Sequence, residues 1–192
     1  GNKIVVERLV LGGVAISSLF GAIQATLLLN AEDGRIQAAL NWLIGSLNAR
    51  GWQEIKFTAL PILIALFIGL FLYRQLNLLS LGDELSVSLG TSLFRSRCLI
   101  GAIATLLAAC AVSIGGLIGF IGLIVPHFSR LLIGNDFKYI LPFSALIGAL
   151  TLSSADLISR LGPIEIPVGI VTALLGAPVF MFILYNRTNF KK

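Results

Sequence analysis

The stretch that decides the fold is residues 98–129, which read CLIGAIATLLAACAVSIGGLIGFIGLIVPHFS and contain 32 residues without a charge. Because about 20 apolar residues cross a bilayer as one helix, this run is too long for a single crossing. Its middle, GGLIGFIG at 115–122, carries four glycines, which are typical of a place where one helix ends and another begins. The run therefore predicts two membrane helices, at about 96–115 and 118–133, and the second is short.

Four further uncharged runs lie on either side of this stretch. They are residues 9–31, 57–73, 139–155 and 166–186, with 23, 17, 17 and 21 residues respectively. Together with the divided central run they predict an all-α membrane bundle of six spans, at 6–29, 57–76, 96–115, 118–133, 140–160 and 167–186. An N-terminus inside the cell places ten Lys and Arg residues in inner segments and four in outer ones, as the positive-inside rule requires. Both ends of this chain are therefore expected on the cytoplasmic side.

The composition excludes most other classes of protein. Of the 192 residues, 57% are hydrophobic and 12% are charged, so polar side chains are too few to cover a water-soluble enzyme and charges are too few for a disordered chain. The net charge of +5 is explained by membrane orientation, so no nucleic-acid partner is expected. The sequence has no phosphate-binding loop, nucleophile elbow or metal-ligand spacing. It therefore predicts no ATP hydrolysis by this chain and no catalytic, metal or cofactor site.

Residues 36–48, between the first two spans, show an amphipathic pattern. Ile36, Leu40, Leu43 and Leu47 recur at intervals of three and four residues. The pattern predicts a short helix lying at the outer membrane surface. Such a helix is equally compatible with a plain connection that carries an interfacial anchor and with a wall of an outward opening.

The inner segment between the second and third spans predicts a short helix at about 82–89. Ser80 and Asp83 have the Ser-x-x-acid spacing of a capping box, and Gly90 fits a helix stop. Composition alone favours a solvated loop here, and the alternative is a helix that docks into a groove on a cytosolic partner. The residues that would form the docking helix are Ser80, Gly82, Asp83, Glu84, Leu85, Leu89 and Gly90.

Two polar features accompany the later spans. Asp156 and Arg160 are four residues apart, the spacing that puts opposite charges on one helical face. They form a local ion pair, or else Arg160 points outward and receives an acidic group from a partner. His127 is the only histidine of the chain, and with no second His or Cys ligand nearby it is expected to be structural rather than a metal ligand.

The chain also contains a series of motifs in a fixed order. They are NLLSLGDE at 77–84 with LG at 89–90, GFIGLIVPH at 119–127 with Arg130, LP at 141–142 with SALIGA at 144–149, AD at 155–156, EIPVGIVTA at 165–173 and GAP at 176–178. In this order they make the chain resemble the FecCD family, the permease subunits of bacterial ABC importers for ferric siderophores, haem and vitamin B12. The residues that match the family signature are Gly119, Gly122, Pro126, His127, Arg130, Asp156, Pro167, Gly169, Gly176 and Pro178.

The resemblance implies partners and roles for particular segments. A segment like 80–90 forms the coupling helix that sits on cytosolic ABC ATPase subunits, and a helix like 36–48 flanks the translocation path. An arginine placed like Arg160 meets glutamates of a periplasmic or lipoprotein substrate-binding protein. The resemblance further implies a second permease subunit, in a homodimer or heterodimer, and a place in the lipid of the bacterial cytoplasmic (inner) membrane. The family passes an iron chelate, haem or cobalamin into the cytoplasm.

The resemblance also sets what part of such a permease this chain represents. Family permeases have ten spans, and this chain resembles the last six of them. Residues 1–192 are therefore expected to form a single permease domain without roughly the first four helices. Two other functions stay open on the sequence, an inactive or scaffold membrane fragment and a secondary carrier or channel. A carrier needs a charged or unwound site at mid-membrane, and residues 98–126 and 139–155 offer no such charge.

Overall fold

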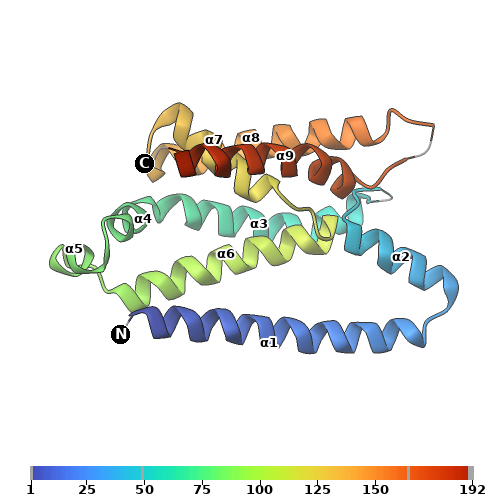
Figure 1. Ribbon diagram of the computed structural model, residues 1–192, viewed down its shortest axis with the longest axis horizontal. Coiled ribbons are helices and arrows are strands. Elements are labelled where there is room, and N and C mark those ends of the chain that lie inside the picture. The colour runs from blue at the N-terminus through green and yellow to red at the C-terminus, as the bar shows by residue number, and fades with distance from the viewer. Residues whose placement is uncertain (1, 49, 164, 190–192) are drawn as a thin grey trace. The chain divides into compact units, whose positions relative to one another are not determined.

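The computed structural model describes residues 2–48, 50–163 and 165–189, and within these ranges it contains nine α-helices and no strand (Figure 1). They are α1 (Asn2–Leu29), α2 (Asp33–Ile44), α3 (Trp52–Phe71), α4 (Tyr73–Ser80), α5 (Asp83–Ser88), α6 (Leu93–Gly115), α7 (Ile121–Ile133), α8 (Phe137–Ser159) and α9 (Val168–Asn189). The predicted all-α class is confirmed for these residues. The chain divides into two compact units, residues 1–41 and 42–192.

The first unit holds α1 and most of α2. Val10–Leu29 of α1 is long and apolar enough to cross a membrane. The sequence predicts the next helix at 36–48, whereas α2 begins at Asp33 and ends at Ile44. The helix stops early because Gly45, the residue that follows it, has a φ of +89°. This left-handed conformation does not continue an α-helix.

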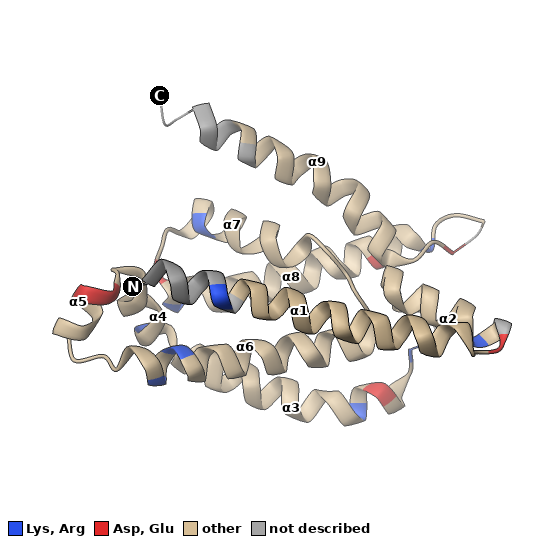
Figure 2. Cartoon of the chain, turned by 60° about the horizontal axis from the view of Figure 1, so that its bottom comes forward, with Lys and Arg blue, Asp and Glu red and all other residues tan. Residues whose placement is uncertain are grey.

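In the second unit, α3 packs along α6, and α8 packs against α4, α7 and α9. One buried cluster consists of Ala155, Val168 and Val171, with Leu47, Ile118 and Leu152 packed against them. Charged residues of α3, α6 and α8 lie near the helix ends, and the middle of each helix carries none (Figure 2). Many apolar side chains on these helices are exposed, as expected where the solvent is lipid rather than water.

Each of the six predicted spans overlaps a helix of the structure. Four of these helices contain a stretch long and apolar enough to cross a membrane, Val10–Leu29, Trp52–Phe71, Leu93–Gly115 and Phe137–Ser159. The apolar helix α7 and the apolar part of α9, Val168–Ile183, are shorter. The division of the long central run into two helices is therefore confirmed, and the number of crossings stays a prediction.

Several predicted spans differ from the helices in their bounds, and the starts of α3 and α8 show why. The sequence predicts helices at 57–76 and 140–160, but α3 begins at Trp52 and α8 at Phe137. In α3 the Glu54 carboxylate accepts a hydrogen bond from the Gly51 N–H at 2.9 Å, and in α8 Asp136 accepts one from the Lys138 N–H at 2.9 Å. Carboxylates in these positions cap the first turn. These carboxylates, which lie just before the predicted spans, therefore belong to the start of each helix.

Candidate functional site

A six-residue helix stands between two longer ones at what we call the α5 corner, residues 80–97 (Figure 1). The predicted short helix is confirmed there, and so is its stop. Gly90 has a φ of +82° and donates its N–H to the Val87 carbonyl, while the Thr91 N–H donates to the Ser86 carbonyl. These two bonds form a Schellman cap, which needs a residue that tolerates positive φ.

The predicted capping box at the start of α5 is wrong. Ser80 ends α4 instead, where its hydroxyl donates to the Asn77 carbonyl at 2.6 Å. The N-cap of α5 is Gly82, with a φ of +99° and no side-chain hydrogen bond. The Asp83 carboxylate pairs with Arg97 at 2.5 Å. A glycine turn therefore separates α4 from α5 and leaves the Ser-x-x-Asp spacing without its reciprocal bonds.

Polar contacts hold α5 against both neighbouring helices. Ser86 is fully buried, and its hydroxyl lies 2.6 Å from the carbonyls of both Leu78 and Gly82. On the other side, the Asp83–Arg97 ion pair joins α5 to the first turn of α6. The short helix is thus fixed by tertiary contacts, since a six-residue helix has too few internal bonds to be stable alone.

The outer side of the α5 corner is apolar and exposed. Leu81, Leu85, Val87 and Leu89 each keep between 55% and 59% of their surface exposed, and Glu84 is exposed among them. All four lie outside the spans that the sequence predicts. A contiguous exposed apolar cluster beside charged side chains is typical of a protein interface.

At the far end of α8, Arg160 is held by an ion pair. Its guanidinium donates two hydrogen bonds to the Asp156 carboxylate, at 3.0 and 3.2 Å. The pKa of Arg160 is raised first by this hydrogen bonding, then by the charge of Asp156 and of Glu165. The local ion pair is therefore confirmed. It fixes the direction of a side chain that stays 44% exposed, so the guanidinium is open to a further acidic group.

Three glycines meet at what we call the glycine junction, Gly45, Gly116 and Gly169. The Gly169 N–H donates to the Gly45 carbonyl at 2.9 Å, and the Ser46 N–H donates to the Gly115 carbonyl at 2.9 Å. An ideal Cβ would lie 2.0 Å from the Trp42 carbonyl oxygen at Gly116 and 1.8 Å from the Ile44 carbonyl oxygen at Gly169. Here the ends of α2 and α6 and the start of α9 touch backbone to backbone.

Only one of these three glycines is singled out by the sequence as a site residue. Gly169 belongs to the family signature, and the close backbone contacts at the junction explain why a residue without a side chain fits there. Gly116 lies in the GGLIGFIG segment that predicts the helix break, but its contact with residue 42 has no signal in the sequence. Gly45 is not predicted at all.

The structure distributes the other signature residues along α7 to α9. Gly176 is buried, and an ideal Cβ there would lie 2.5 Å from the Cβ of Phe120. Gly119 and Gly122 have nothing within 4 Å of an ideal Cβ. The Arg130 guanidinium lies over the Phe137 ring at 5.4 Å. Pro126 and the half-buried His127 lie within α7, Pro167 directly precedes α9, and Pro178 lies within α9.

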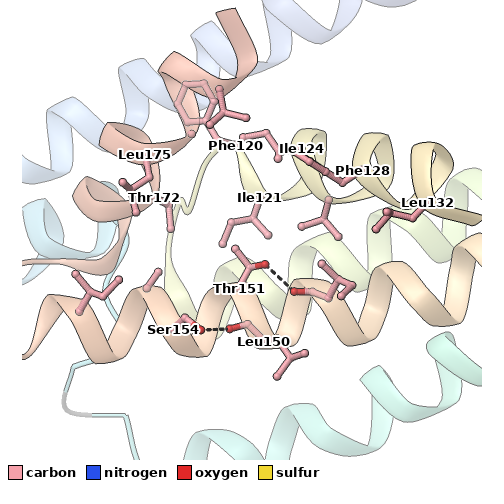
Figure 3. Close-up of a pocket in the computed structure, with 16 residues that line it drawn as sticks. Phe120, Ile121, Ile124, Phe128, Leu132, Leu150, Thr151, Ser154, Thr172 and Leu175 are labelled. Carbon is pink, nitrogen blue, oxygen red and sulfur yellow. Dashed lines mark hydrogen bonds between the residues drawn. The ribbon is translucent and has the colours of Figure 1, made fainter. Parts of the chain in front are cut away.

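Helices α7, α8 and α9 line an apolar cavity of about 540 Å³ (Figure 3). Its few polar groups are engaged within the protein. Thr151 and Ser154 donate their hydroxyls to carbonyls one turn back on α8, at 2.7 and 2.8 Å, and Thr172 donates to Gly169 at 3.1 Å. The lining carries no charged side chain. In the described ranges no group of three His, Cys, Asp or Glu residues is placed to hold a metal ion.

Comparison with known proteins gives a consistent set of matches. The model of the FecCD transport family matches residues 1–186. The cobalamin import system permease protein of Halobacterium salinarum is 42% identical over 181 residues, 93% of this chain and 48% of that protein. An Fe(3+)-citrate import system permease protein of Bacillus subtilis is 44% identical over 180 residues, 93% of this chain and 54% of that protein.

Two further matches extend the comparison. The hemin transport system permease protein of Yersinia pestis is 39% identical over 182 residues, 94% of this chain and 54% of that protein. A solved structure, described as an inward-facing conformation of a metal-chelate type ABC transporter, superposes with a TM-score of 0.85 at 36% identity and covers 91% of this chain and 57% of that one. The chain thus spans about half the length of the curated relatives that it matches.

Proposed function

Because the chain belongs to the FecCD transport family, we propose that it forms part of the membrane-spanning permease of an ATP-binding-cassette importer. The family match over residues 1–186 is the observation that carries the proposal. The α5 corner supports it, since its exposed apolar side chains lie between two membrane helices, where a cytosolic partner would bind. The chain is not an enzyme in this proposal, and ATP is hydrolysed by separate cytosolic subunits.

The substrate that we propose is an iron chelate, haem or cobalamin. The relatives are named for cobalamin, Fe(3+)-citrate and hemin, which are all metal complexes. The chain would offer such a substrate a passive route, because the middle parts of its long helices carry no charge to bind or drive it. A substrate-binding protein outside the membrane would deliver the substrate, and the half-exposed Arg160 is the residue that we propose it contacts.

The topology that we propose has six crossings of the bacterial inner membrane. The short helices α7 and α9 then cross together with the four longer spans, and both ends of the chain face the cytoplasm. The α5 corner lies on the cytoplasmic side and Arg160 on the outer side. A second permease subunit, identical or homologous, completes the transporter.

The docking of an ATPase at the α5 corner is tested by co-purification from the native membrane. The double variant Glu84→Lys and Leu85→Asp changes two exposed side chains of α5. Asp83 is left intact because it pairs with Arg97, and its replacement would disturb the corner itself. The affinity-tagged variant is expected to reach the membrane but to lose the ATPase subunit. The control, Glu32→Lys, reverses an exposed acidic residue elsewhere and should keep the ATPase.

Either of two results would contradict the proposal. Undiminished recovery of the ATPase with the double variant would remove the α5 corner as the docking site. A wild-type chain that brings down no P-loop ATPase would argue against the importer itself.

A further inference from the structure

Asn77, on α4, reaches across to the start of α8. Its side-chain amide nitrogen donates to Asp136 Oδ1 at 2.8 Å, and its amide oxygen accepts the Phe137 backbone N–H at 3.0 Å. The same Asp136 oxygen caps α8 by accepting the Lys138 N–H at 2.9 Å. Both polar ends of one side chain are thus used between helices that are far apart in the sequence. Two bonds to one amide fix the orientation of the helices as well as their separation.

The residue next to Asn77 is bonded to α5. Ser86 is fully buried on α5, with its hydroxyl 2.6 Å from the Leu78 carbonyl. Since Asn77 and Leu78 are neighbours on α4, consecutive hydrogen bonds join α5, α4 and α8. The link from α5 to α6 is of another kind, because it is an ion pair between the Asp83 and Arg97 side chains.

We propose that Asn77 is the positioning residue that makes α5 and α8 move as one body. The inference rests on the proposed function, in which ATPase subunits bind at the α5 corner. Helix α8 has 23 residues and is therefore about 35 Å long at 1.5 Å per residue. It lines the apolar cavity, and Arg160 is its C-cap residue. A displacement of α5 by the ATPase is delivered through Asn77 to the start of α8, and along that helix to its opposite end.

Two variants of Asn77 test this role, with a matched control. Asn77→Ala removes both hydrogen bonds. Asn77→Asp keeps the shape and the acceptor for Phe137, but it removes the donor and sets a second carboxylate against Asp136. The control is Asn30→Ala, because Asn30 donates its side-chain amide to the Thr26 carbonyl of the preceding turn and reaches no other helix through that bond.

The first measurement is the distance distribution between spin labels on α5 and α8, by pulsed electron resonance on the chain in lipid nanodiscs. Labels at Leu85→Cys and Leu146→Cys occupy exposed positions, after Cys98 and Cys110 are replaced by serine. Both Asn77 variants are expected to broaden the distribution, and Asn30→Ala should leave it as narrow as in the wild type. A distribution that is unchanged in both Asn77 variants would overturn the inference.

The second measurement is substrate-stimulated ATP turnover by the complete importer complex from the native membrane. With the ATPase still bound, both Asn77 variants are expected to lose about tenfold in stimulation, while the unstimulated turnover is kept. Equal stimulation in wild type and variants would refute the transmission of movement. A wild-type complex without an ATPase would instead contradict the proposed function, and the label distances would still decide whether Asn77 positions α8.

Discussion

Replacing Gly169 by alanine is expected to force apart chain segments that now touch. The new Cβ would lie 1.8 Å from the Ile44 carbonyl oxygen and 3.1 Å from that of Gly45. The Gly169 N–H also donates to the Gly45 carbonyl at 2.9 Å. Because the atoms in the way belong to the backbone, no change of side-chain rotamer relieves the clash. Either the start of α9 or the turn at Gly45 must shift, and the hydrogen bond between them is then lost.

The size of this effect follows from the contacts. Overpacking of a close contact costs about 1–3 kcal/mol, and a lost hydrogen bond adds about 1 kcal/mol. A loss of about 3 kcal/mol lowers the melting temperature of a domain of this size by about 6–12 °C, at 2–4 °C per kcal/mol. The assay is thermal unfolding of the detergent-solubilised protein. The folded fraction at each temperature is measured by size-exclusion chromatography with tryptophan-fluorescence detection.

The matched control is Gly122→Ala on α7. Gly122 is another glycine of the family signature, but an ideal Cβ there has nothing within 4 Å. Alanine in a helix is favoured over glycine, so this variant should melt at the wild-type temperature or slightly above it. If Gly169→Ala had the same melting temperature as Gly122→Ala, the backbone contact at the glycine junction would not be what holds α9, and the reasoning would fail.

Two further predictions concern the two ends of α8. Arg160→Ala is expected to weaken binding of the substrate-loaded binding protein by about tenfold, equal to about 1.4 kcal/mol, in a surface-plasmon-resonance titration, and the effect should shrink in high salt. Arg35→Ala, at another exposed ion pair, should bind as the wild type does, and equal affinity of both variants would exclude Arg160 as the contact. The pKa of Asp136 is lowered, chiefly by the Asn77 side-chain donor and then by the Lys138 N–H. A carboxyl with a lowered folded-state pKa stabilises the fold above its unfolded pKa, about 3.9, and loses that contribution as pH falls through the folded value. The label distances between α5 and α8 should therefore stay narrow through neutral pH and broaden only below about pH 4, and Asp136→Asn should remove this acid dependence.

The sequence predicts the helices well because the cost of burying a charge in a bilayer is large and local. Uncharged runs therefore mark the helices, and the four glycines at 115–122 mark the break between α6 and α7. The boundaries are predicted less well. Glu54 and Asp136 lie before the predicted spans at 57–76 and 140–160, yet each caps the helix that forms there. A charge at a helix start is stabilised by the free N–H groups there, and hydropathy does not register that bond.

At the candidate site, too, some features are predicted well from the sequence and others are not. Gly90 is predicted correctly because a Schellman cap depends on the residues of one turn. The capping box at Ser80 fails because Asp83 has a stronger partner in Arg97, 14 residues further on. Asn77 and Asp136 are 59 residues apart, and the bond between them appears only once α4 packs against α8. Contacts made by the tertiary structure decide these positions, and a single sequence carries no record of them.

The two ends of α6 are held to their neighbours by different kinds of contact. At its C-terminal end, the Gly115 carbonyl accepts the Ser46 N–H, and an ideal Cβ at Gly116 would lie 2.0 Å from the Trp42 carbonyl oxygen. At its N-terminal end, about 35 Å away for 23 residues, Arg97 forms an ion pair with Asp83 of α5, and the two side chains are 57% and 29% exposed. Replacing a backbone contact requires the chain to move, whereas an exposed ion pair exchanges with water at little cost. The backbone contacts at the glycine junction are therefore expected to hold α6 more firmly than the ion pair at the α5 corner does.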